Sequence, residues 1–385
     1  MSDDVRGDAM TGGESRDEKY NLGMIPGDTP PARLFRGREQ RPKGSTLESS
    51  VSVTYIESNS MSQRKKSVLE MLRSTQDFVS GEAISDVLGI SRNAVHKHVK
   101  SLRKRGYRIV GVSRRGYRLE DEPSRLSMAH VTDRTEKTMF GHSFRYHDEL
   151  DSTNAEAKGL AVRGAPEGTV VVAEVQNAGR GRLGRRWTSP AGKGLLFTAV
   201  LRPDLPMSEA HLLTLVAAAA TAEAIDKHVA TKVSIKWPND LFINDRKVGG
   251  ILLEISGEQD ETDWVLVGIG LNVNTEFSDL PVALRRTATS LKMVTGEVVD
   301  RSELLAAVLL NLEKHYKAAL RGGFERAISA FRERDYLHSR TVSIETRQGP
   351  VTGEAVGIDE RGALLIQLPE RRIRSFHSGD VTLHV

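Results

Sequence analysis

Three segments following residue 61 repeat hydrophobic side chains every three or four positions, which is the spacing of one face of a helix. Helix by helix, these hydrophobic positions are Val68, Leu69 and Leu72; Ala83, Ile84, Val87 and Leu88; and Val95, Val99 and Leu102. Ser80 and Ser91 stand where they would cap the second and third helices, and Gly89 marks the turn between them. Residues 107–120 then alternate around a turn, as a β-hairpin does. The pattern predicts a winged helix-turn-helix over residues 61–122.

After a linker at residues 123–127, the hydrophobic pattern mixes strands with helices. The expected strands are 144–150, 168–176, 194–203, 232–238, 241–244, 250–256 and 264–274, and the expected helices are 153–164, 208–229, 301–321 and 324–335. This mixture predicts an α/β or α+β domain of catalytic size over residues 128–338. Five short alternating segments with glycine or proline turns follow, and they predict a small β-barrel over residues 339–385.

Residues 1–60 show no hydrophobic periodicity and are rich in Gly, Ser, Asp, Arg and Pro, so we expect a disordered tail without a signal peptide. Met61 directly precedes the first periodic segment and offers an alternative start. The longest apolar run, 212–225, has about 14 residues, too few to cross a bilayer core of roughly 30 Å, and predicts a buried helix and no membrane partner. The absence of cysteine excludes disulfides, thiolate metal sites and a cysteine nucleophile, and it fits a cytoplasmic protein.

The net charge is +4 with a pI near 9.1, and the basic residues gather in two places. The first is the third helix of the winged helix together with the hairpin turn. The residues expected there to contact DNA are Ser91, Arg92, Asn93, His96, Lys97, Lys100, Arg114 and Arg115, with Arg103 and Lys104 beside phosphates. Winged helices also serve as dimerisation or protein-binding modules, but the basic helix and basic hairpin favour DNA.

The second basic cluster is the stretch QNAGRGRLGRRW, residues 176–187. Its glycines Gly179, Gly181 and Gly184 match the G-x-G-x-x-G pattern of a dinucleotide-binding turn, which requires a helix directly afterwards. Here the chain runs through proline and glycine into another strand at residue 194, which argues against a Rossmann turn. We instead expect a mobile loop whose arginines fold over a polyanion such as a nucleoside triphosphate.

Polar residues flank this loop in the sequence. Ser152 and Thr153 stand at a strand-to-helix junction, where their hydroxyls either cap the helix or bind a neutral polar ligand. The stretch KWPNDLFINDRKVGGILLE, residues 236–254, places two lysines, an amide and a carboxylate within a dozen positions. These are Lys236, Asn239, Asp240 and Lys247. Such a set can bind a carboxylate, phosphates and Mg²⁺, although a solvated hairpin end would carry similar residues.

Four motifs in this order, GRGRLGRRW, KWPNDLFI, DRKVGGILLE and GIGLNVN, resemble those of bifunctional biotin protein ligases, the biotin operon repressor family. The resemblance extends over residues 62–385 and implies a ligase domain of the class II synthetase type followed by an SH3-like barrel. It also implies that the protein joins biotin to ATP with Mg²⁺ and holds biotinyl-5'-adenylate until a lysine of the biotin carrier domain of a carboxylase attacks it. A homodimer formed with the adenylate bound would repress transcription at a palindromic operator.

The same resemblance implies roles for the residues that match the family motifs. The biotin ureido group would be held by Ser152, Thr153 and Asn154, with Gln176 at the border of the pocket. The loop ordered over the adenylate would include Gly179, Arg180, Gly181 and Arg182, with Trp187 near the adenine side. Lys247 would contact the biotin carboxylate and the α-phosphate, while Gly249 and Gly250 would leave room for the ligand. The expected catalytic residues are Arg180, Lys236, Asp240 and Lys247; Asn239 and Asn272 complete the binding set, and ATP phosphates would hold most of the metal.

Two alternatives and one departure from the family remain. A regulator whose α/β domain only senses a ligand would not need the retained lysines and arginines, and a lipoate ligase would have no reason for a winged helix. The family's last strand often carries an acidic and a basic residue that reach the catalytic domain. Here Asp380 keeps the acid, but His384 occupies the position of the base, which puts that contact in doubt.

Overall fold

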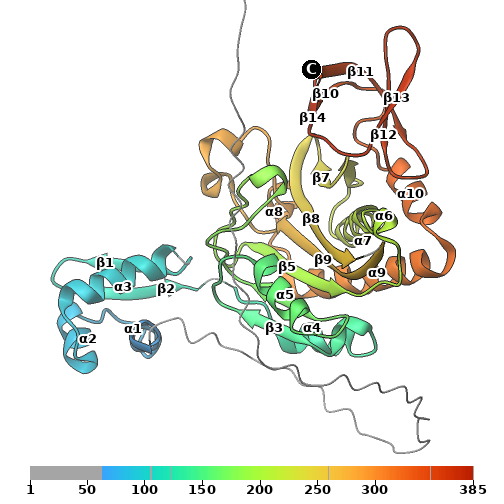
Figure 1. The fold of residues 1–385 in the computed structure, drawn as a ribbon. Helices are drawn as coiled ribbons and strands as arrows, with labels where there is room; N and C mark the ends of the chain where they lie inside the picture. The colour runs from blue at the N-terminus through green and yellow to red at the C-terminus, as the bar shows by residue number, and fades with distance from the viewer. Residues whose placement is uncertain (1–62, 105, 123, 259, 347, 385) are drawn as a thin grey trace, which may run out of the picture. The chain divides into compact units, whose positions relative to one another are not determined.

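The computed structural model describes residues 63–104, 106–122, 124–258, 260–346 and 348–384 (Figure 1). The tail predicted for residues 1–60 and the alternative start at Met61 lie outside the described residues. Within the described part of the chain, no helix has both the length and the apolar character needed to cross a membrane.

The amino-terminal part of the described chain is the predicted winged helix. Its elements are α1 (Gln63–Arg73), α2 (Gly81–Leu88), α3 (Arg92–Lys104), β1 (Arg108–Val112) and β2 (Gly116–Asp121). Ser80 caps α2 by accepting from the Ala83 N–H at 3.0 Å, and Gly89 ends it in the left-handed conformation with φ 60°. Ser91 accepts from the Ala94 N–H at 3.1 Å at the start of α3. Both caps and the turn glycine are therefore confirmed.

The core of the winged helix contains all but two of the predicted hydrophobic positions. Ile84 is fully buried and Leu88 half-buried, but Val87 is 70% exposed and Ala83 is also exposed, so the prediction for these two was wrong. The helix has only eight residues and packs through one row, Ile84 and Leu88. Val87 lies about 100° around the helix from Leu88, outside that row.

The central domain is built on a seven-stranded sheet. In spatial order its strands are β3 (Phe144–His147), β4 (Val170–Ala173), β5 (Gly194–Leu201), β9 (Glu261–Asn272), β8 (Arg246–Glu258), β7 (Asp240–Ile243) and β6 (Ser234–Lys236). Only β3 and β4 run parallel, and every other neighbouring pair is antiparallel. All residues of β4 and β5 are buried, because helices cover both faces of this part of the sheet.

Helices lie on both faces of this sheet (Figure 1). On one face α5 (Thr153–Val162) packs through Ala157 and Ala161 against Val171, Val200 and Leu266. The hydrophobic core beneath the other face takes in α4 (Met128–Thr135), α7 (Leu213–Asp226), α9 (Arg301–Gly322) and α10 (Glu325–Arg332). The apolar run at 212–225 forms a buried helix, as predicted.

The single helix expected at residues 208–229 was wrong, because the chain forms α6 (Met207–Ala210) and α7 instead. The first of these packs against β8 and β9, whereas α7 packs against α9. Between them the main-chain N–H groups of Leu212 and Thr214 donate three residues back, to Glu209 O and His211 O, so the α-helical hydrogen-bond pattern is interrupted at His211 and Leu212. The short helices α4 and α8 (Leu291–Thr295) were not anticipated, since neither is long enough to show a clear period.

The carboxyl-terminal residues form a small all-β domain with five antiparallel strands. In spatial order these are β13 (Ile373–Phe376), β12 (Leu364–Gln367), β11 (Gly349–Ile358), β10 (Thr341–Thr346) and β14 (Val381–Leu383). Its buried side chains belong to the same hydrophobic core as the central sheet. The turn before β12 contacts the central domain through main-chain carbonyls. The Trp237 indole N–H donates to Gly362 O at 2.9 Å, and the Arg332 guanidinium donates to Ile358 O at 2.8 Å.

Candidate active site

A cavity of about 660 Å³ opens between the sheet, several loops and the carboxyl-terminal domain. Most of its lining comes from six places: the start of α5 at residues 152–154, the loop 180–190, the turn 236–240, strands β8 and β9, the segment 275–288, and residues 379–383; Gln176, Phe242, Asp245 and Tyr336 complete it. The basic loop and the two polar clusters singled out in the sequence therefore meet at one site.

The buried floor of the cavity is lined by polar side chains that carry no charge. Ser152, Thr153 and Asn154 are each about 95% buried, and Ser152 makes no helix-capping hydrogen bond through its side chain. Gln176 Oε1 accepts from the Thr153 main-chain N–H at 2.7 Å. Capping alone therefore does not account for Ser152, whose hydroxyl lines the cavity.

Thr198 on β5 organises this floor and was missed by the sequence analysis. Its hydroxyl lies 2.8 Å from the Thr153 hydroxyl and 2.7 Å from Asn154 Oδ1. The Asn154 amide nitrogen in turn donates to Glu254 Oε1 at 2.9 Å. The signal was one polar residue inside the apolar strand GLLFTAVL, which a buried strand keeps when its hydroxyl has partners.

Glycines of the motif GIGLNVN on β9 make room for the neighbouring side chains. A Cβ at Gly268 would lie 2.1 Å from Asn154 Oδ1, and one at Gly270 would lie 2.8 Å from the Trp187 ring. Trp187 thus lies directly on the strand, with its indole N–H buried and without a hydrogen-bond partner. Lys247 Nζ lies 5.7 Å from the centre of this ring. The glycines of this motif are therefore explained by the close packing of neighbouring side chains against β9 in the cavity wall.

The turn between β6 and β7, with a cis peptide bond between Trp237 and Pro238, carries most of the polar residues predicted to bind phosphates. Asp240 Oδ1 accepts from Lys247 Nζ at 2.6 Å, and the Asn239 amide donates to Ile251 O at 2.6 Å. Burial lowers the pKa of Lys236 from its ordinary value of 10.5, although Asp240 and Asp380 oppose this effect.

The basic loop is closed on itself across its base. Trp187 N–H donates to Gly179 O at 2.9 Å, and Gly181 N–H donates to Arg185 O at 2.7 Å. The short turn η2 (Arg182–Gly184) lies at its tip, and β5 follows without an α-helix, which confirms that this is not a Rossmann turn.

Two arginines fix the loop above the cavity. The Arg182 guanidinium donates to Asn239 Oδ1 at 3.3 Å and to Gly379 O at 3.4 Å, and burial lowers its pKa. Arg185 forms an ion pair with Asp380. The acidic residue of the last strand therefore does reach the loop, whereas His384 bonds Ser343 within its own domain and does not.

Twelve of the fourteen predicted ligand-binding residues line the cavity, together with all four predicted catalytic residues. The two that do not are Gly179 and Gly249. A Cβ at Gly249 would lie 2.4 Å from Leu271 Cδ2, and one at Gly179 would lie 2.5 Å from Trp187 O. These glycines let neighbouring segments pack closely behind the residues that line the cavity.

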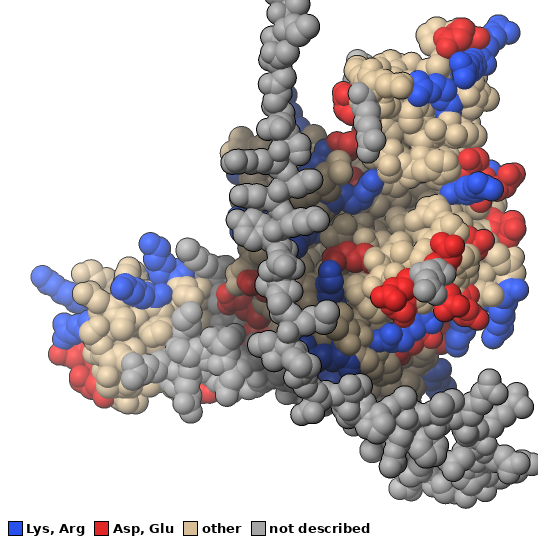
Figure 2. All heavy atoms as spheres, viewed as in Figure 1, with Lys and Arg blue, Asp and Glu red and all other residues tan. Residues whose placement is uncertain are grey.

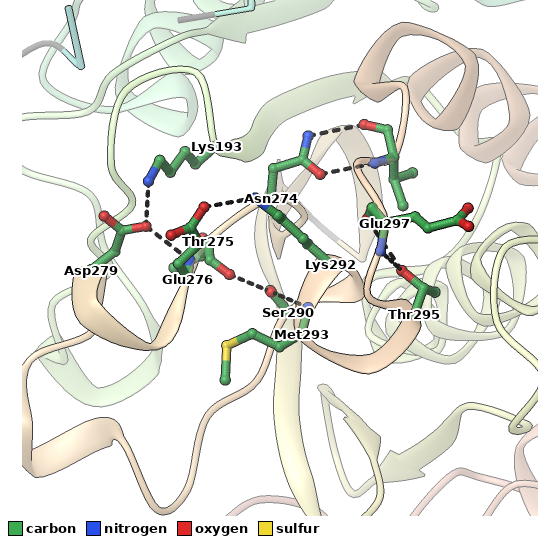
Figure 3. Close-up of polar contacts among 11 residues, drawn as sticks. Lys193, Asn274, Thr275, Glu276, Asp279, Ser290, Lys292, Met293, Thr295 and Glu297 are labelled. Atoms are coloured by element: carbon green, nitrogen blue, oxygen red, sulfur yellow. Dashed lines mark hydrogen bonds and ion pairs between the residues drawn. The ribbon is translucent and has the colours of Figure 1, made fainter. Parts of the chain in front are cut away.

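Residues 274–298, here called the roof segment, cover one side of the cavity and were also missed. Thr275, Asp279, Leu280, Leu284 and Ala288 are among its lining residues. Figure 3 shows the polar network that anchors the segment; its labelled members are Lys193 from the loop before β5 and residues of the roof segment itself, from Asn274 to Glu297. The segment contains no hydrophobic period, so the sequence offered no signal for it.

The winged helix exposes the predicted DNA-contacting residues. Ser91, Arg92, Asn93, His96, Lys97, Lys100, Arg114 and Arg115 are all exposed. Figure 2 shows Lys and Arg side chains on this part of the molecule, at the left of the view. The Arg103 Nε–H donates to Ile109 O at 2.8 Å, so this side chain joins α3 to β1.

Three family descriptions match the chain in the order of these elements. "HTH domain" matches residues 64–118, "Biotin/lipoate A/B protein ligase family" matches 146–272, and "Biotin protein ligase C terminal domain" matches 340–383. The fold and the site therefore define a protein ligase of the biotin/lipoate class joined to a helix-turn-helix domain.

Similar proteins show which family within this class the chain belongs to. "Bifunctional ligase/repressor BirA" of Bacillus subtilis (strain 168) is 39% identical over 320 residues, which are 83% of this chain and 98% of the relative. The protein of the same name from Escherichia coli (strain K12) is 30% identical over 80% of this chain and 93% of its own. The chain belongs to the family of bifunctional biotin protein ligases and repressors, and the resemblance inferred from its motifs is confirmed.

A solved structure agrees with this assignment. The biotin protein ligase from Aquifex aeolicus in complex with biotin and ATP matches with a TM-score of 0.55 and 32% identity, covering 63% of this chain and 98% of that protein. The predicted fold class is confirmed by the same comparisons.

Proposed function

We propose that the protein activates biotin with ATP inside this cavity and passes it to a lysine of a biotin carrier domain. The observation that carries this proposal is a single cavity in which a neutral polar floor adjoins a cluster of cations. Six cationic side chains and four carboxylates line it: Arg180, Arg182, Arg185, Arg186, Lys236 and Lys247, with Asp240, Asp245, Asp279 and Asp380.

The floor suits the uncharged ureido end of biotin. Ser152, Thr153 and Asn154 present hydroxyl and amide groups, which can donate to a ureido oxygen and accept from ureido N–H groups. Their positions are set by Thr198 and Glu254, so little ordering is left for the ligand to impose. The carboxylate end of biotin would then point toward the cations.

The first step joins two anions. An oxygen of the biotin carboxylate attacks the α-phosphorus of ATP, a new O–P bond forms, and the bond to the bridging oxygen breaks so that pyrophosphate leaves. Repulsion between the reactants dominates this barrier, so positioned cations are the main requirement. Lys247 is the best placed of these cations. Asp240 holds its side chain and the roof segment holds its main chain, where the neutral floor adjoins the cluster of cations.

The second step needs no nucleophile from the protein. The unprotonated amine of the acceptor lysine attacks the acyl carbon, the C–O bond to AMP breaks, and the amine releases a proton to solvent. Because the adenylate also reacts with water, the basic loop and the roof segment would protect it until the acceptor arrives.

Magnesium fits this site mainly as a partner of the phosphates. When bound, Mg²⁺ neutralises phosphate charge and orients the leaving group. Asn239 Oδ1 and the Asp240 carboxylate are the oxygen ligands available beside the phosphate-facing cations. Among the residues with described positions, no three His, Cys, Asp or Glu side chains gather into a metal site, so phosphate oxygens would supply most ligands.

We further propose that the winged helix makes the protein a biotin-responsive repressor. Exposed cations on α3 and the hairpin turn suit DNA phosphates, and the adjacent polar side chains suit base edges. A homodimer favoured by the bound adenylate would place two winged helices on a palindromic operator. Both partners, DNA and a carrier domain, would be met in the cytoplasm.

The decisive test is pyrophosphate release by the full chain with Mg-ATP and either biotin or lipoate, before any acceptor is added. We expect a biotin-dependent burst of about one pyrophosphate per active site, followed by slow turnover. A burst with lipoate alone would reassign the substrate. No release with either acid would leave a domain that only senses its ligand.

A further inference from the structure

The middle of the roof segment is held down by one side chain from elsewhere in the chain. Lys193, in the loop before β5, places its Nζ 2.6 Å from Asp279 Oδ2, the ion pair drawn in Figure 3. Among the described residues, no other side chain outside residues 274–298 forms a hydrogen bond or ion pair with residues 276–286. Asp279 lines the cavity, whereas Lys193 does not.

The ends of the roof segment are anchored independently of this pair. Asn274 exchanges two hydrogen bonds of 2.9 Å with the main chain of Val299. Farther along, Lys247 N–H donates to Thr287 O and Thr289 N–H donates to Lys247 O, both at 2.8 Å. Among the described residues, the only polar side-chain contact from the stretch between these anchors to the ligase body is the one with Lys193, and Leu280 is its one buried hydrophobic side chain.

The same stretch is unsuited to stay in place without such a contact. Phe277 is 55% exposed and Val282 is 76% exposed, and among the hydrophobic side chains of residues 276–286 only Leu280, 7% exposed, is buried. The remaining side-chain contacts, such as the Arg285 N–H to Leu280 O, lie within the segment and do not tie it to the body. Besides Leu280, a single partly exposed pair of charges holds this stretch over the cavity.

We propose that Lys193 is a positioning residue that sets how long the activated intermediate is retained, by clipping Asp279 and the roof segment over the cavity. This inference rests on the proposed adenylation for its kinetic consequence, but the clip itself is a property of the free protein. Because Lys193 lies outside the lining, its effect reaches the ligand only through Asp279.

The chain offers a matched control in the same segment. Lys292 and Glu276 form an ion pair of equal length, 2.6 Å, and Lys292 is 30% exposed where Lys193 is 32% exposed. Neither Lys292 nor Glu276 lines the cavity. Replacing this pair removes the same kind of interaction without unclipping the middle of the roof segment.

The first experiment measures hydrogen exchange of the ligand-free full chain for Lys193→Met, Lys193→Arg and Lys292→Met. Lys193→Met should raise exchange of the main chain over residues 276–286 by about three- to tenfold, since one partly exposed charged hydrogen bond is lost. Lys193→Arg keeps the charge and should restore protection, and Lys292→Met should leave residues 277–286, beyond its own partner Glu276, within twofold. Unchanged exchange in Lys193→Met overturns the clip, whatever the protein catalyses.

The second experiment follows release of preformed biotinyl-5'-adenylate after a chase with unlabelled biotin. Lys193→Met and Asp279→Asn should each speed release by about three- to tenfold, and the double variant should be no faster than either. High salt should speed release from the natural protein but barely affect Lys193→Met. Equal retention in all variants, or an equal loss in Lys292→Met, overturns the proposal. Absence of any burst in the natural protein would instead refute the adenylation.

Discussion

Contacts of both its side chain and its main chain fix the position of Lys247 in the site. Its ammonium group contacts the Asp240 carboxylate at 2.6 Å and lies 5.7 Å from the centre of the Trp187 ring. Its main-chain N–H and C=O are both paired with the roof segment. A cation fixed in this way needs little rearrangement when charge develops near it, which is the condition for effective electrostatic stabilisation.

We therefore expect Lys247→Ala to lower the rate of pyrophosphate release by about 10²- to 10³-fold. Lys314→Ala, at an exposed position of α9 outside the cavity lining, serves as the control for removing a lysine and should keep the natural rate. Circular dichroism should report an unchanged fold in both variants. A rate within threefold of the natural one would remove Lys247 from the catalytic set.

The surroundings of Lys236 predict how ATP binding should change with pH. Burial lowers its pKa, so its positive charge is lost as the pH rises through a value below the 10.5 of an ordinary lysine. ATP binding should weaken over that range, and Lys236→Arg should move the weakening to higher pH because arginine stays charged. Calorimetric titration of ATP across the alkaline range measures this. Identical pH profiles for the two proteins would contradict the prediction.

Among the elements, the β6–β7 turn depends on a domain that contributes few lining residues. The Trp237 indole N–H donates to Gly362 O at 2.9 Å, and Trp237 is 97% buried between Lys236 and Pro238. Gly362 has φ 72°, and a Cβ there would lie 2.9 Å from Leu212 Cδ2. The carboxyl-terminal domain thus supports the turn that carries Lys236, Asn239 and Asp240.

Trp237→Phe keeps an aromatic ring but removes the N–H, which leaves the Gly362 carbonyl without its donor. A loss of about 1 kcal/mol in positioning corresponds to roughly a fivefold lower kcat for adenylation. Trp264→Phe is the matched control, because Trp264 is also buried but lies outside the cavity lining. Equal kcat values for the two variants would show that the contact does not position the turn.

At the scale of the whole molecule, basic residues serve two separate surfaces. One set faces the cavity, where acidic partners such as Asp240 and Asp380 hold it in place. The other set lies exposed on α3 and the hairpin turn of the winged helix. A modest net charge of +4 therefore conceals two concentrated positive regions, each suited to a different polyanion.

Lys97→Ala and Lys100→Ala should each lower the salt dependence of DNA binding, reducing the slope of log Kobs against log salt by about 1. Fluorescence anisotropy with a random-sequence duplex measures this without knowledge of the operator. Lys158→Ala, at an exposed position of α5 in the ligase domain, should leave the slope unchanged. Unaltered slopes for both α3 variants would indicate that this helix contacts a protein instead.

The pattern of hydrophobic and polar residues over a few neighbouring positions was enough to predict much of this structure. Periodicity located the winged helix and most strands, and twelve of the fourteen ligand-binding residues predicted from the motifs line the cavity, although the roof segment was missed. Such features depend on neighbours within a few positions, which a sequence displays directly. The break before α7 and the exposure of Val87 were missed, because both depend on which other elements each helix contacts.

The sequence by itself determined the elements, the two basic regions and the chemistry of the site. Only the tertiary structure decided how distant residues pair, as between Thr198 and Asn154, Lys193 and Asp279, and Arg185 and Asp380, which are 44, 86 and 195 positions apart. The physical reason is that hydrophobic and polar patterns tell each element which face to bury but not which partner it will meet. That choice follows from the order of strands in the sheet and the packing of loops over its edge.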